Sequence, residues 1–306
     1  MKVVVTGGSG FIGSNLVSEL LKNHDVTVID NLSTGRIENL DYIRDKLEFI
    51  QGSITDPDLL KRAFAGADTV FHQAAIPSVQ KSVDNPIASN EANVEGTLKV
   101  LAAARDYSVR KVVYASSSSV YGDTPTLPKR EEMKPNPKSP YAVSKLAGEY
   151  YCQVFSDVYG LKTVSLRYFN IFGPRQNPHS EYAAVIPRFV TRILDGKPPV
   201  IYGDGQQTRD FTFVKDVVKA NILAMNCEEE GVFNIACGRR ISLNELADRI
   251  MEITGNFIDP VYEKTRAGDI KDSLADISVA REKMGYLPDY DIVSGLKETI
   301  KWFQKT

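Results

Sequence analysis

Short apolar runs alternate with amphipathic stretches along the first half of the chain. The apolar runs, rich in Val and Ile, predict strands at Lys2–Thr6, Asp25–Asp30, Leu47–Gln51, Thr69–Gln73, Lys111–Ser116 and Lys162–Arg167. The stretches between them predict helices at Gly13–Leu21, Pro57–Phe64, Pro86–Asp106 and Ser139–Tyr159. Near-continuous apolar strands that alternate with helices are typical of a parallel sheet covered on both faces. With right-handed crossovers, the pattern predicts an α/β fold with a doubly wound parallel Rossmann sheet.

The pattern changes after about residue 170, where a loop rich in Gly, Pro and Asn begins. Beyond it we expect helices at Val185–Leu194, Asp216–Met225, Leu243–Thr254, Ser278–Met284 and Ile292–Gln304, and a strand at Phe233–Ala236. This mixture predicts a smaller C-terminal α/β lobe interleaved with the end of the sheet. We expect residues 1–170 and 212–238 to form the Rossmann domain, and residues 171–211 and 239–306 to form the smaller lobe.

The composition is that of a globular protein, with 42% hydrophobic and 25% charged residues and a net charge of −2. This charge balance shows no basic excess, so we expect no nucleic-acid partner. The cysteines Cys152, Cys227 and Cys237 do not fit a disulfide framework, and the three histidines are too scattered for a metal site. The sequence shows neither a secretory signal nor 18 consecutive apolar residues, so we expect a cytoplasmic protein without a membrane span.

A glycine-rich loop follows the first predicted strand and opens the first helix. Residues 6–13 read Thr-Gly-Gly-Ser-Gly-Phe-Ile-Gly, which contains the G-x-G-x-x-G spacing. Such glycines let a diphosphate approach the backbone, and the helix N-terminus offers it free N–H groups and a positive dipole end. Asp30 ends the second strand, where a carboxylate accepts hydrogen bonds from an adenosine ribose. Because it would repel a 2′-phosphate, the pattern favours NAD over NADP, although the nearby Arg36 softens that preference.

A Tyr-x-x-x-Lys pair, Tyr141 and Lys145, lies in the fourth predicted helix, and residues four apart share one helix face. A free tyrosine has a pKa of about 10 and is a poor base at neutral pH. We therefore expect the Lys145 ammonium and the positive nicotinamide ring to lower the pKa of Tyr141. The strand end Tyr114-Ala-Ser-Ser-Ser-Ser-Val-Tyr-Gly122 places serines at the sheet edge that binds ligands in doubly wound folds. A serine hydroxyl there would relay the proton of a substrate alcohol to Tyr141.

These three elements together resemble the extended short-chain dehydrogenase/reductase family over essentially the whole chain. Within that family the sequence is most similar to nucleotide-sugar epimerases of the UDP-glucose/UDP-N-acetylglucosamine 4-epimerase type. The segments that carry the resemblance are Thr6–Asn15, Asp30–Leu32, Asn93–Thr97, Ser116–Gly122, Tyr141–Lys145, Leu166–Asn170, Arg209–Phe211 and Arg266–Asp269.

The resemblance implies residue roles. Tyr141 is the implied base, Lys145 its partner and Ser117 the hydroxyl relay. The implied NAD contacts are Gly7, Gly10, Phe11, Ile12, Gly13, Asp30, Asn31, Ser33, Thr34, Gly35, Ser53, Ile54, Gln73, Ala74, Ala75, Asn93, Ser116, Tyr141, Lys145 and Tyr168. The implied substrate contacts also include Ser117, Ser118, Tyr141 and Val185. Asn170 and Arg209 are implied to hold the diphosphate, and Tyr202 to stack on uracil. Arg266 and Asp269 are implied to bind phosphate and the uridine ribose. The alternative to phosphate binding at Arg209-Asp210 is a local salt bridge on the surface.

Two positions depart from the family pattern. Pro77 stands where many 4-epimerases have a lysine near the nicotinamide, and Ser53 stands where many have an aspartate. Both departures concern cofactor contacts in loops and leave Ser117, Tyr141 and Lys145 untouched.

The resemblance implies NAD-dependent 4-epimerisation of a UDP-sugar through a transient 4-keto sugar, with NAD as a bound cofactor. A dTDP-sugar 4,6-dehydratase is disfavoured, because Ser118 and Ser119 stand where related dehydratases carry an acid and a base. A UDP-glucuronate 4-epimerase fits the serine run and stays open. Ser273 stands where epimerases restricted to unacetylated hexoses have a bulky Tyr. We therefore expect UDP-GlcNAc and UDP-GalNAc to be accepted as well as UDP-glucose and UDP-galactose.

Two other classes compete with this interpretation. An idle NAD-binding regulator commonly lacks the Tyr/Lys pair that this chain keeps, and an ordinary reductase exchanges NAD(P)H in each cycle. The helices predicted at Pro86–Asp106 and Ser139–Tyr159 are apolar on more than one face. In the family such helices form an intersubunit four-helix bundle, so we expect a homodimer, with a monomer that buries these faces internally as the alternative.

Overall fold

A computed structural model of the chain describes residues 1–178, 184–265 and 271–305. Its centre is a seven-stranded sheet with the order β11-β6-β5-β4-β1-β2-β3, in which each pairing is parallel. The strands are β1 (Lys2–Thr6), β2 (Asp25–Asp30), β3 (Glu48–Gln51), β4 (Thr69–His72), β5 (Lys111–Ser117), β6 (Lys162–Tyr168) and β11 (Gly231–Ile235). The predicted doubly wound parallel sheet is confirmed.

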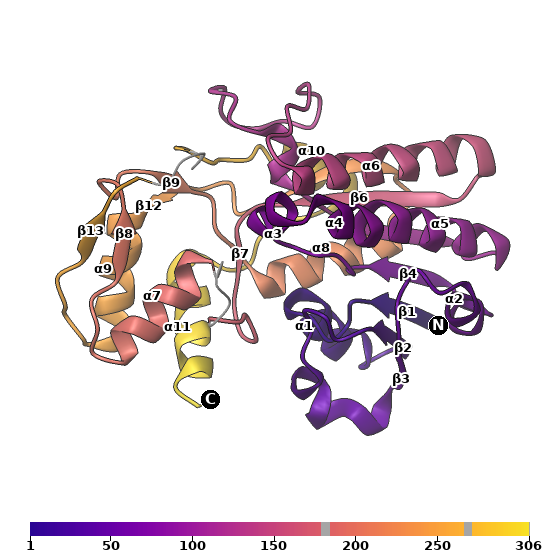
Figure 1. The fold of residues 1–306 in the computed structure, drawn as a ribbon, viewed down its shortest axis with the longest axis horizontal. Helices are drawn as coiled ribbons and strands as arrows, with labels where there is room; N and C mark the ends of the chain where they lie inside the picture. Colours follow the sequence, from indigo (N-terminus) through magenta and orange to yellow (C-terminus); the bar gives the residue numbers. More distant parts are fainter. Residues whose placement is uncertain (179–183, 266–270, 306) are drawn as a thin grey trace.

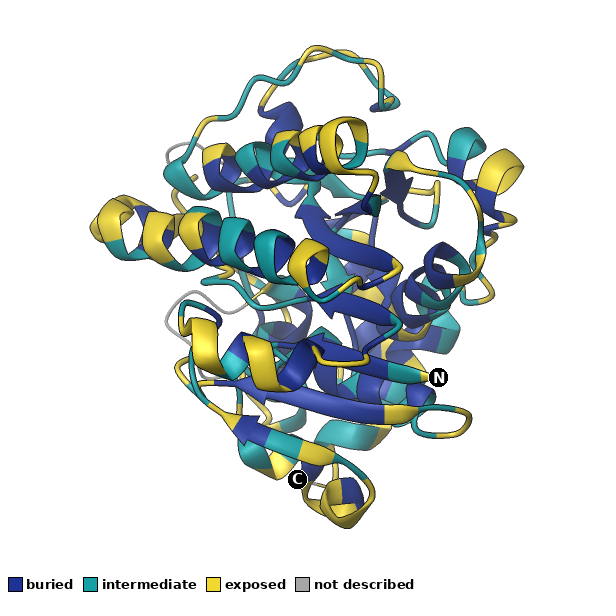
Figure 2. Cartoon of the chain, turned by 90° about the vertical axis from the view of Figure 1, so that its right-hand side faces the viewer, coloured by how far each residue is buried: buried dark blue, intermediate teal, exposed yellow. Residues whose placement is uncertain are grey.

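Helices cover both faces of this sheet (Figure 1). On one face lie α1 (Phe11–Leu20), α8 (Val214–Asn226) and α10 (Ser278–Met284), which bury their apolar side chains in one core. On the other face α2 (Pro57–Phe64), α5 (Gly96–Asp106) and α6 (Pro140–Tyr159) share a second core with the strands. The strands are buried between helices whose outer faces are exposed (Figure 2). This packing brings the carboxyl ends of the parallel strands to one edge of the sheet.

A smaller lobe lies beside that edge. It contains α7 (Val185–Leu194), α9 (Leu243–Thr254), α11 (Ile292–Phe303) and the strand pairs β7 (Ile171–Phe172) with β10 (Thr212–Phe213), β9 (Thr208–Arg209) with β12 (Ile241–Ser242), and β8 (Val200–Tyr202) with β13 (Val261–Glu263). Phe172, Phe189, Phe213, Leu246 and Leu296 belong to its core. The expected interleaved lobe is confirmed, but the short strands were not predicted because two or three residues show no readable period.

The helix predicted at Pro86–Asp106 is not continuous. It consists of α4 (Pro86–Asn90), a π-helical turn η2 (Glu91–Glu95) and α5. Such turns insert a residue into the helix and re-aim a side chain, often at a functional site. Further short helices, α3 (Val79–Asp84), η1 (Ile37–Lys46) and η3 (Ser118–Tyr121), lie in segments where no element was predicted.

The packing of α10 differs from the predicted domain boundaries. Residues 239–306 were assigned to the smaller lobe, yet Ala280 and Met284 of α10, together with Tyr286, are buried in the core of the Rossmann sheet. The chain therefore returns to the first domain after α9. Among the described residues, none of the helices has the length and apolar character needed to cross a membrane.

Candidate active site

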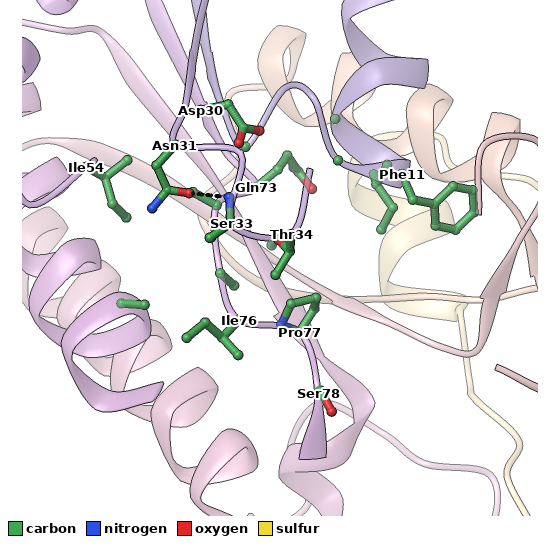
Figure 3. A pocket seen from close by; sticks show the side chains of 18 of the residues that line it. Phe11, Asp30, Asn31, Ser33, Thr34, Ile54, Gln73, Ile76, Pro77 and Ser78 are labelled. Atoms are coloured by element: carbon green, nitrogen blue, oxygen red, sulfur yellow. Dashed lines mark hydrogen bonds between the residues drawn. The ribbon is translucent and has the colours of Figure 1, made fainter. Parts of the chain in front are cut away.

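A cavity of about 530 Å³ opens at the carboxyl edge of the sheet. Its lining includes most of the predicted cofactor contacts: Gly7, Gly10, Phe11, Ile12, Gly13, Asp30, Asn31, Ser33, Thr34, Ser53, Ile54, Gln73, Ala74, Ala75, Ser116, Tyr141, Lys145 and Tyr168. Residues that sequence reasoning missed also line it: Ile76, Ser78, Lys81, Ala92, Arg175, Gln176, Asn177 and Ala184. In Figure 3, Asp30, Asn31, Ser33 and Thr34 come from one segment, and Ile76, Pro77 and Ser78 come from the loop after β4.

The glycine loop passes so close to other backbone that side chains do not fit. A Cβ on Gly7, whose φ is +71°, would lie 2.7 Å from the Ala74 nitrogen, and one on Gly13 would lie 2.1 Å from the Gly7 oxygen. The first turn of α1, which begins at Phe11, has no side-chain cap at Gly10. Its N–H groups are therefore available to an anion in the cavity, as the diphosphate of a dinucleotide requires.

Asp30 is buried at the end of β2, where its carboxylate accepts hydrogen bonds from the Ser9 nitrogen at 2.9 Å and the Leu32 nitrogen at 2.8 Å. Burial raises the pKa of Asp30, and these N–H groups oppose that rise. Gly35 does not line the cavity but lies behind this carboxylate, because a Cβ on it would be 2.9 Å from the Asp30 Oδ2. Arg36 lines the cavity beside them.

Asn93 lies in the π-helical turn and also stands behind the cavity wall. Its Oδ1 accepts from the Ile76 nitrogen at 2.8 Å, and its Nδ2 donates to the Ser144 Oγ at 3.1 Å. The side chain thereby ties the loop after β4 to α6. Asn93 therefore supports the wall of the cavity from behind, whereas the resemblance implied a direct contact between Asn93 and NAD.

The predicted catalytic side chains come together where β5 ends and α6 begins. Ser139 caps α6 by accepting from the Ala142 nitrogen at 3.1 Å, and Pro140 occupies the first turn. The Ser117 side chain lies beside the Tyr141 hydroxyl, where it opposes the rise in the pKa of Tyr141 that burial causes. The Lys145 Nζ lies 6.0 Å from the centre of the Tyr141 ring and donates to the Ala115 oxygen at 2.8 Å.

In the chain without a cofactor, the pKa of Tyr141 does not shift in the expected direction. Burial raises the pKa of Tyr141, and the neighbouring Ser117 side chain only partly offsets this rise. Lys145 is almost fully buried, and burial foremost lowers its pKa to about 8. Lys145 alone therefore does not lower the pKa of Tyr141 below its ordinary value, because desolvation outweighs the other effects.

A second cavity, of about 260 Å³, lies in the smaller lobe. The predicted substrate contacts Asn170, Val185, Tyr202 and Arg209 line it, and so does Arg188, which sequence reasoning missed. The Arg188 guanidinium lies 5.6 Å from the centre of the Tyr202 ring. One available signal was its spacing, since it follows Val185 by three residues on the same helix face. Ser117 and Ser118 line neither cavity, and Arg266 and Asp269 lie outside the described residues.

Asp210 lies between Arg209 and Phe211, which both line this second cavity. It is fully buried and accepts hydrogen bonds from the nitrogens of Cys237 at 3.0 Å, Gly238 at 3.1 Å and Ala275 at 3.2 Å. Its backbone oxygen accepts from the Asn170 Nδ2 at 2.9 Å. Burial raises the pKa of Asp210 to about 6. The alternative of a surface salt bridge at Arg209 and Asp210 is therefore wrong, because the aspartate is internal.

Among the residues that the structure describes, no group of three His, Cys, Asp or Glu side chains is placed to hold a metal ion. Tyr141 and Lys145 line the larger cavity, and Ser117 follows Ser116 in its wall.

Comparisons with known proteins agree with this geometry. The model of the NAD dependent epimerase/dehydratase family matches residues 3–236. The UDP-N-acetylglucosamine 4-epimerase of Methanobrevibacter ruminantium, solved with UDP-N-acetylmuramic acid, is 46% identical, with a TM-score of 0.96, over 99% of this chain and 98% of that one. The UDP-glucose 4-epimerase of Thermotoga maritima, solved with UDP-glucose, is 40% identical, with a TM-score of 0.96, over 100% and 99% of the two chains. The UDP-glucuronic acid 4-epimerase of Bacillus cereus, solved with UDP-glucuronic acid and NAD, is 32% identical, with a TM-score of 0.92, over 100% and 99%.

The chain belongs to the NAD dependent epimerase/dehydratase family. Within that family it is an isomerase that works with NAD.

Proposed function

We propose that the chain interconverts C4 epimers of UDP-sugars, namely UDP-glucose with UDP-galactose and UDP-GlcNAc with UDP-GalNAc. The observation that carries this proposal is the meeting of Ser117, Tyr141 and Lys145 at the edge of the cavity that fits NAD. A second cavity lined by Asn170, Tyr202 and Arg209 supplies the groups that suit a nucleotide diphosphate.

In this proposal Ser117 and Tyr141 receive the proton of the sugar 4-hydroxyl. Ser117 donates to and accepts from the reacting alcohol, and Tyr141 holds the proton until the alcohol is restored. When bound, NAD supplies the redox chemistry at C4. Because burial keeps the phenol of the cofactor-free chain protonated, Tyr141 needs the positive charge of bound NAD in addition to Lys145.

Inversion requires the 4-keto sugar to turn over while its nucleotide stays in place. Asn170 in the turn before β7, Arg188 on α7 and Arg209 on β9 line the nucleotide cavity. We propose that these groups hold the UDP portion, whereas the sugar is held lightly enough to rotate. Tight uniform binding of the sugar would lower KM without raising kcat.

We propose that Ser273 leaves room for the N-acetyl group at C2. The Ser273 Oγ lies 3.3 Å from the Asn170 Nδ2, so this small side chain adjoins the nucleotide cavity. The name of the Methanobrevibacter ruminantium relative, a UDP-N-acetylglucosamine 4-epimerase, supports the same assignment.

The experiment that tests the proposed activity is incubation of the purified protein with UDP-glucose, UDP-GlcNAc, UDP-glucuronate and dTDP-glucose, followed by NMR of the products. We expect inverted C4 in the first two. Inversion of UDP-glucuronate alone would identify the second candidate, which the serine run and the Bacillus cereus relative favour. Loss of water would identify a dehydratase, and no change an idle NAD-binding protein.

We also propose a homodimer formed through α5 and α6. Val143, Tyr150, Val154 and Val158 are each about half exposed on α6 and recur at helical spacing. A contiguous apolar stripe on a helix surface marks an interaction surface. A four-helix bundle with a second copy would cover it. The expected cytoplasmic location remains a prediction.

A further inference from the structure

A buried ion pair lies behind the catalytic side chains. Glu149 follows Lys145 by one turn of α6, and Arg167 lies near the end of β6. The Arg167 Nε donates to the Glu149 Oε1 at 2.8 Å, and the Arg167 Nη2 donates to the Oε2 at 2.7 Å. The Glu149 side chain is 3% exposed and the Arg167 side chain is 5% exposed. Desolvation makes such a pair a weak source of stability, and apolar residues of similar volume often replace one without loss. Stability therefore does not explain why this buried pair lies behind the catalytic side chains.

The pair contacts the catalytic end of β5. The Ser116 hydroxyl donates a hydrogen bond to the Glu149 carboxylate, and Ser116 both lines the cofactor cavity and precedes Ser117. The Arg167 Nη1 donates to the Tyr121 hydroxyl at 2.8 Å. The two charges thereby join α6, β5, β6 and η3 within the layer that presents Ser117, Tyr141 and Lys145.

The pair also determines the charge that Lys145 faces. The charged and titratable groups facing Lys145 are Tyr114 on β5, His72 on β4, and Tyr141, Glu149 and Cys152 on α6. Burial foremost raises the pKa of Cys152 to about 12 and lowers that of His72 to about 3, so both are neutral near pH 7. Burial also raises the pKa values of both tyrosines. Of these described groups, Glu149, which forms the ion pair with Arg167, is the one that presents a negative charge to Lys145.

We infer that Glu149, held by Arg167, is a positioning residue that fixes Ser116 against α6 and keeps Lys145 in its charged form. The inference rests on the proposed function of this site, because Lys145 matters only where Tyr141 exchanges a proton. Glu149 acts through its neighbours, since its side chain does not line the cavity.

The test uses the double variant Glu149→Leu/Arg167→Met, which removes both charges and fills their space with apolar side chains. We expect it to fold, to retain NAD and to keep KM, while kcat falls about tenfold because the catalytic groups lose their alignment. Without Glu149 the pKa of Lys145 falls, so the alkaline limb of the kcat profile moves to lower pH. A double variant with wild-type kcat and pH profile would overturn the inference.

Two further variants separate charge from geometry. Ser116→Ala removes the link to β5 but leaves both charges, so we expect a loss of kcat without a shift of the alkaline limb. Lys219→Met is the control, because it breaks an exposed ion pair with Asp289 far along the chain from these residues, and neither kcat nor the limb should change. A shift of the limb in Ser116→Ala would contradict the assigned role of the Glu149 charge.

A readout independent of turnover is the NMR titration of the Lys145 side chain in cofactor-free protein, with the resonance assigned by Lys145→Arg. We expect its midpoint to fall in Glu149→Gln, a variant that also serves if the double variant does not fold. An unchanged midpoint would refute the electrostatic role of Glu149. Failure of the proposed function is distinguishable, because the wild-type protein would then convert none of the UDP-sugars while this titration stays measurable.

Discussion

The Ser117 side chain lies beside the Tyr141 hydroxyl and opposes the rise in the pKa of that phenol, although the two residues belong to a strand and a helix joined by a long connection. The contact connects the end of β5 to the first turn of α6, and Lys145 lies one turn further along the same helix. This arrangement gives a substrate alcohol a short route for its proton.

We expect Tyr141→Phe to lower kcat by a factor of about 10³ or more, because the phenol is the group that holds the proton. The ring still packs in the same place, so NAD retention and the melting temperature should stay near those of the wild type. Stopped assays with UDP-glucose measure kcat, and the absorbance of the bound cofactor measures NAD retention. Tyr262→Phe is a suitable control, since Tyr262 is 54% exposed on β13 and lines neither cavity. Wild-type turnover by Tyr141→Phe would refute the proposed base.

Asp210 should make the folded protein less stable as the pH rises. Burial raises its pKa from the ordinary 3.8 to about 6, so its contribution to stability is fully present below about pH 4 and is lost as the pH rises through 6. The shift corresponds to roughly 3 kcal/mol of unfolding free energy. We expect denaturant unfolding of wild type and Asp210→Asn to show a difference that changes by about this amount between pH 4 and pH 7. A difference that does not depend on pH would contradict the account.

Ser273→Tyr should selectively impair the acetylated substrates. The added ring would occupy the space beside Asn170 that we assign to the N-acetyl group. We expect kcat/KM for UDP-GlcNAc to fall at least tenfold, whereas kcat/KM for UDP-glucose changes little. Ser273→Ala is the matched control, since it removes the hydroxyl without adding volume. Equal losses for both substrates would show that Ser273 does not discriminate by size.

Val154→Arg should disrupt the proposed dimer. Val154 is 48% exposed in the middle of the apolar stripe on α6, and a charge there would be buried in the four-helix bundle without a partner. We expect sedimentation analysis to give a dimer for the wild type and a monomer for the variant. Val261→Arg is the control on β13, where the side chain is 44% exposed in the smaller lobe. A wild-type protein that sediments as a monomer would refute the dimer.

The sequence predicted those parts of the fold that follow from local periodicity. The Val-rich strands, the glycine loop and the Tyr141/Lys145 spacing each depend on neighbours within one or two turns, so their pattern is readable along the chain. The helix α7 was likewise predicted with the bounds that the structure has, because its apolar face recurs at helical spacing.

Other features depend on contacts between distant segments and left no local pattern. Asp210 is buried through the backbone nitrogens of Cys237, Gly238 and Ala275, which only the fold brings to it. The direction of the Tyr141 pKa shift depends on burial by surrounding elements, and a count of nearby charges in the sequence does not include that burial.

The return of α10 to the first domain determines how the protein can be divided. Ala280 and Met284 complete the flank of β11, so a fragment that stops at residue 238 would expose an apolar face to water. The Rossmann domain therefore needs α10 from the later part of the chain. A chimera that exchanges the smaller lobe between relatives must keep α10 with the sheet.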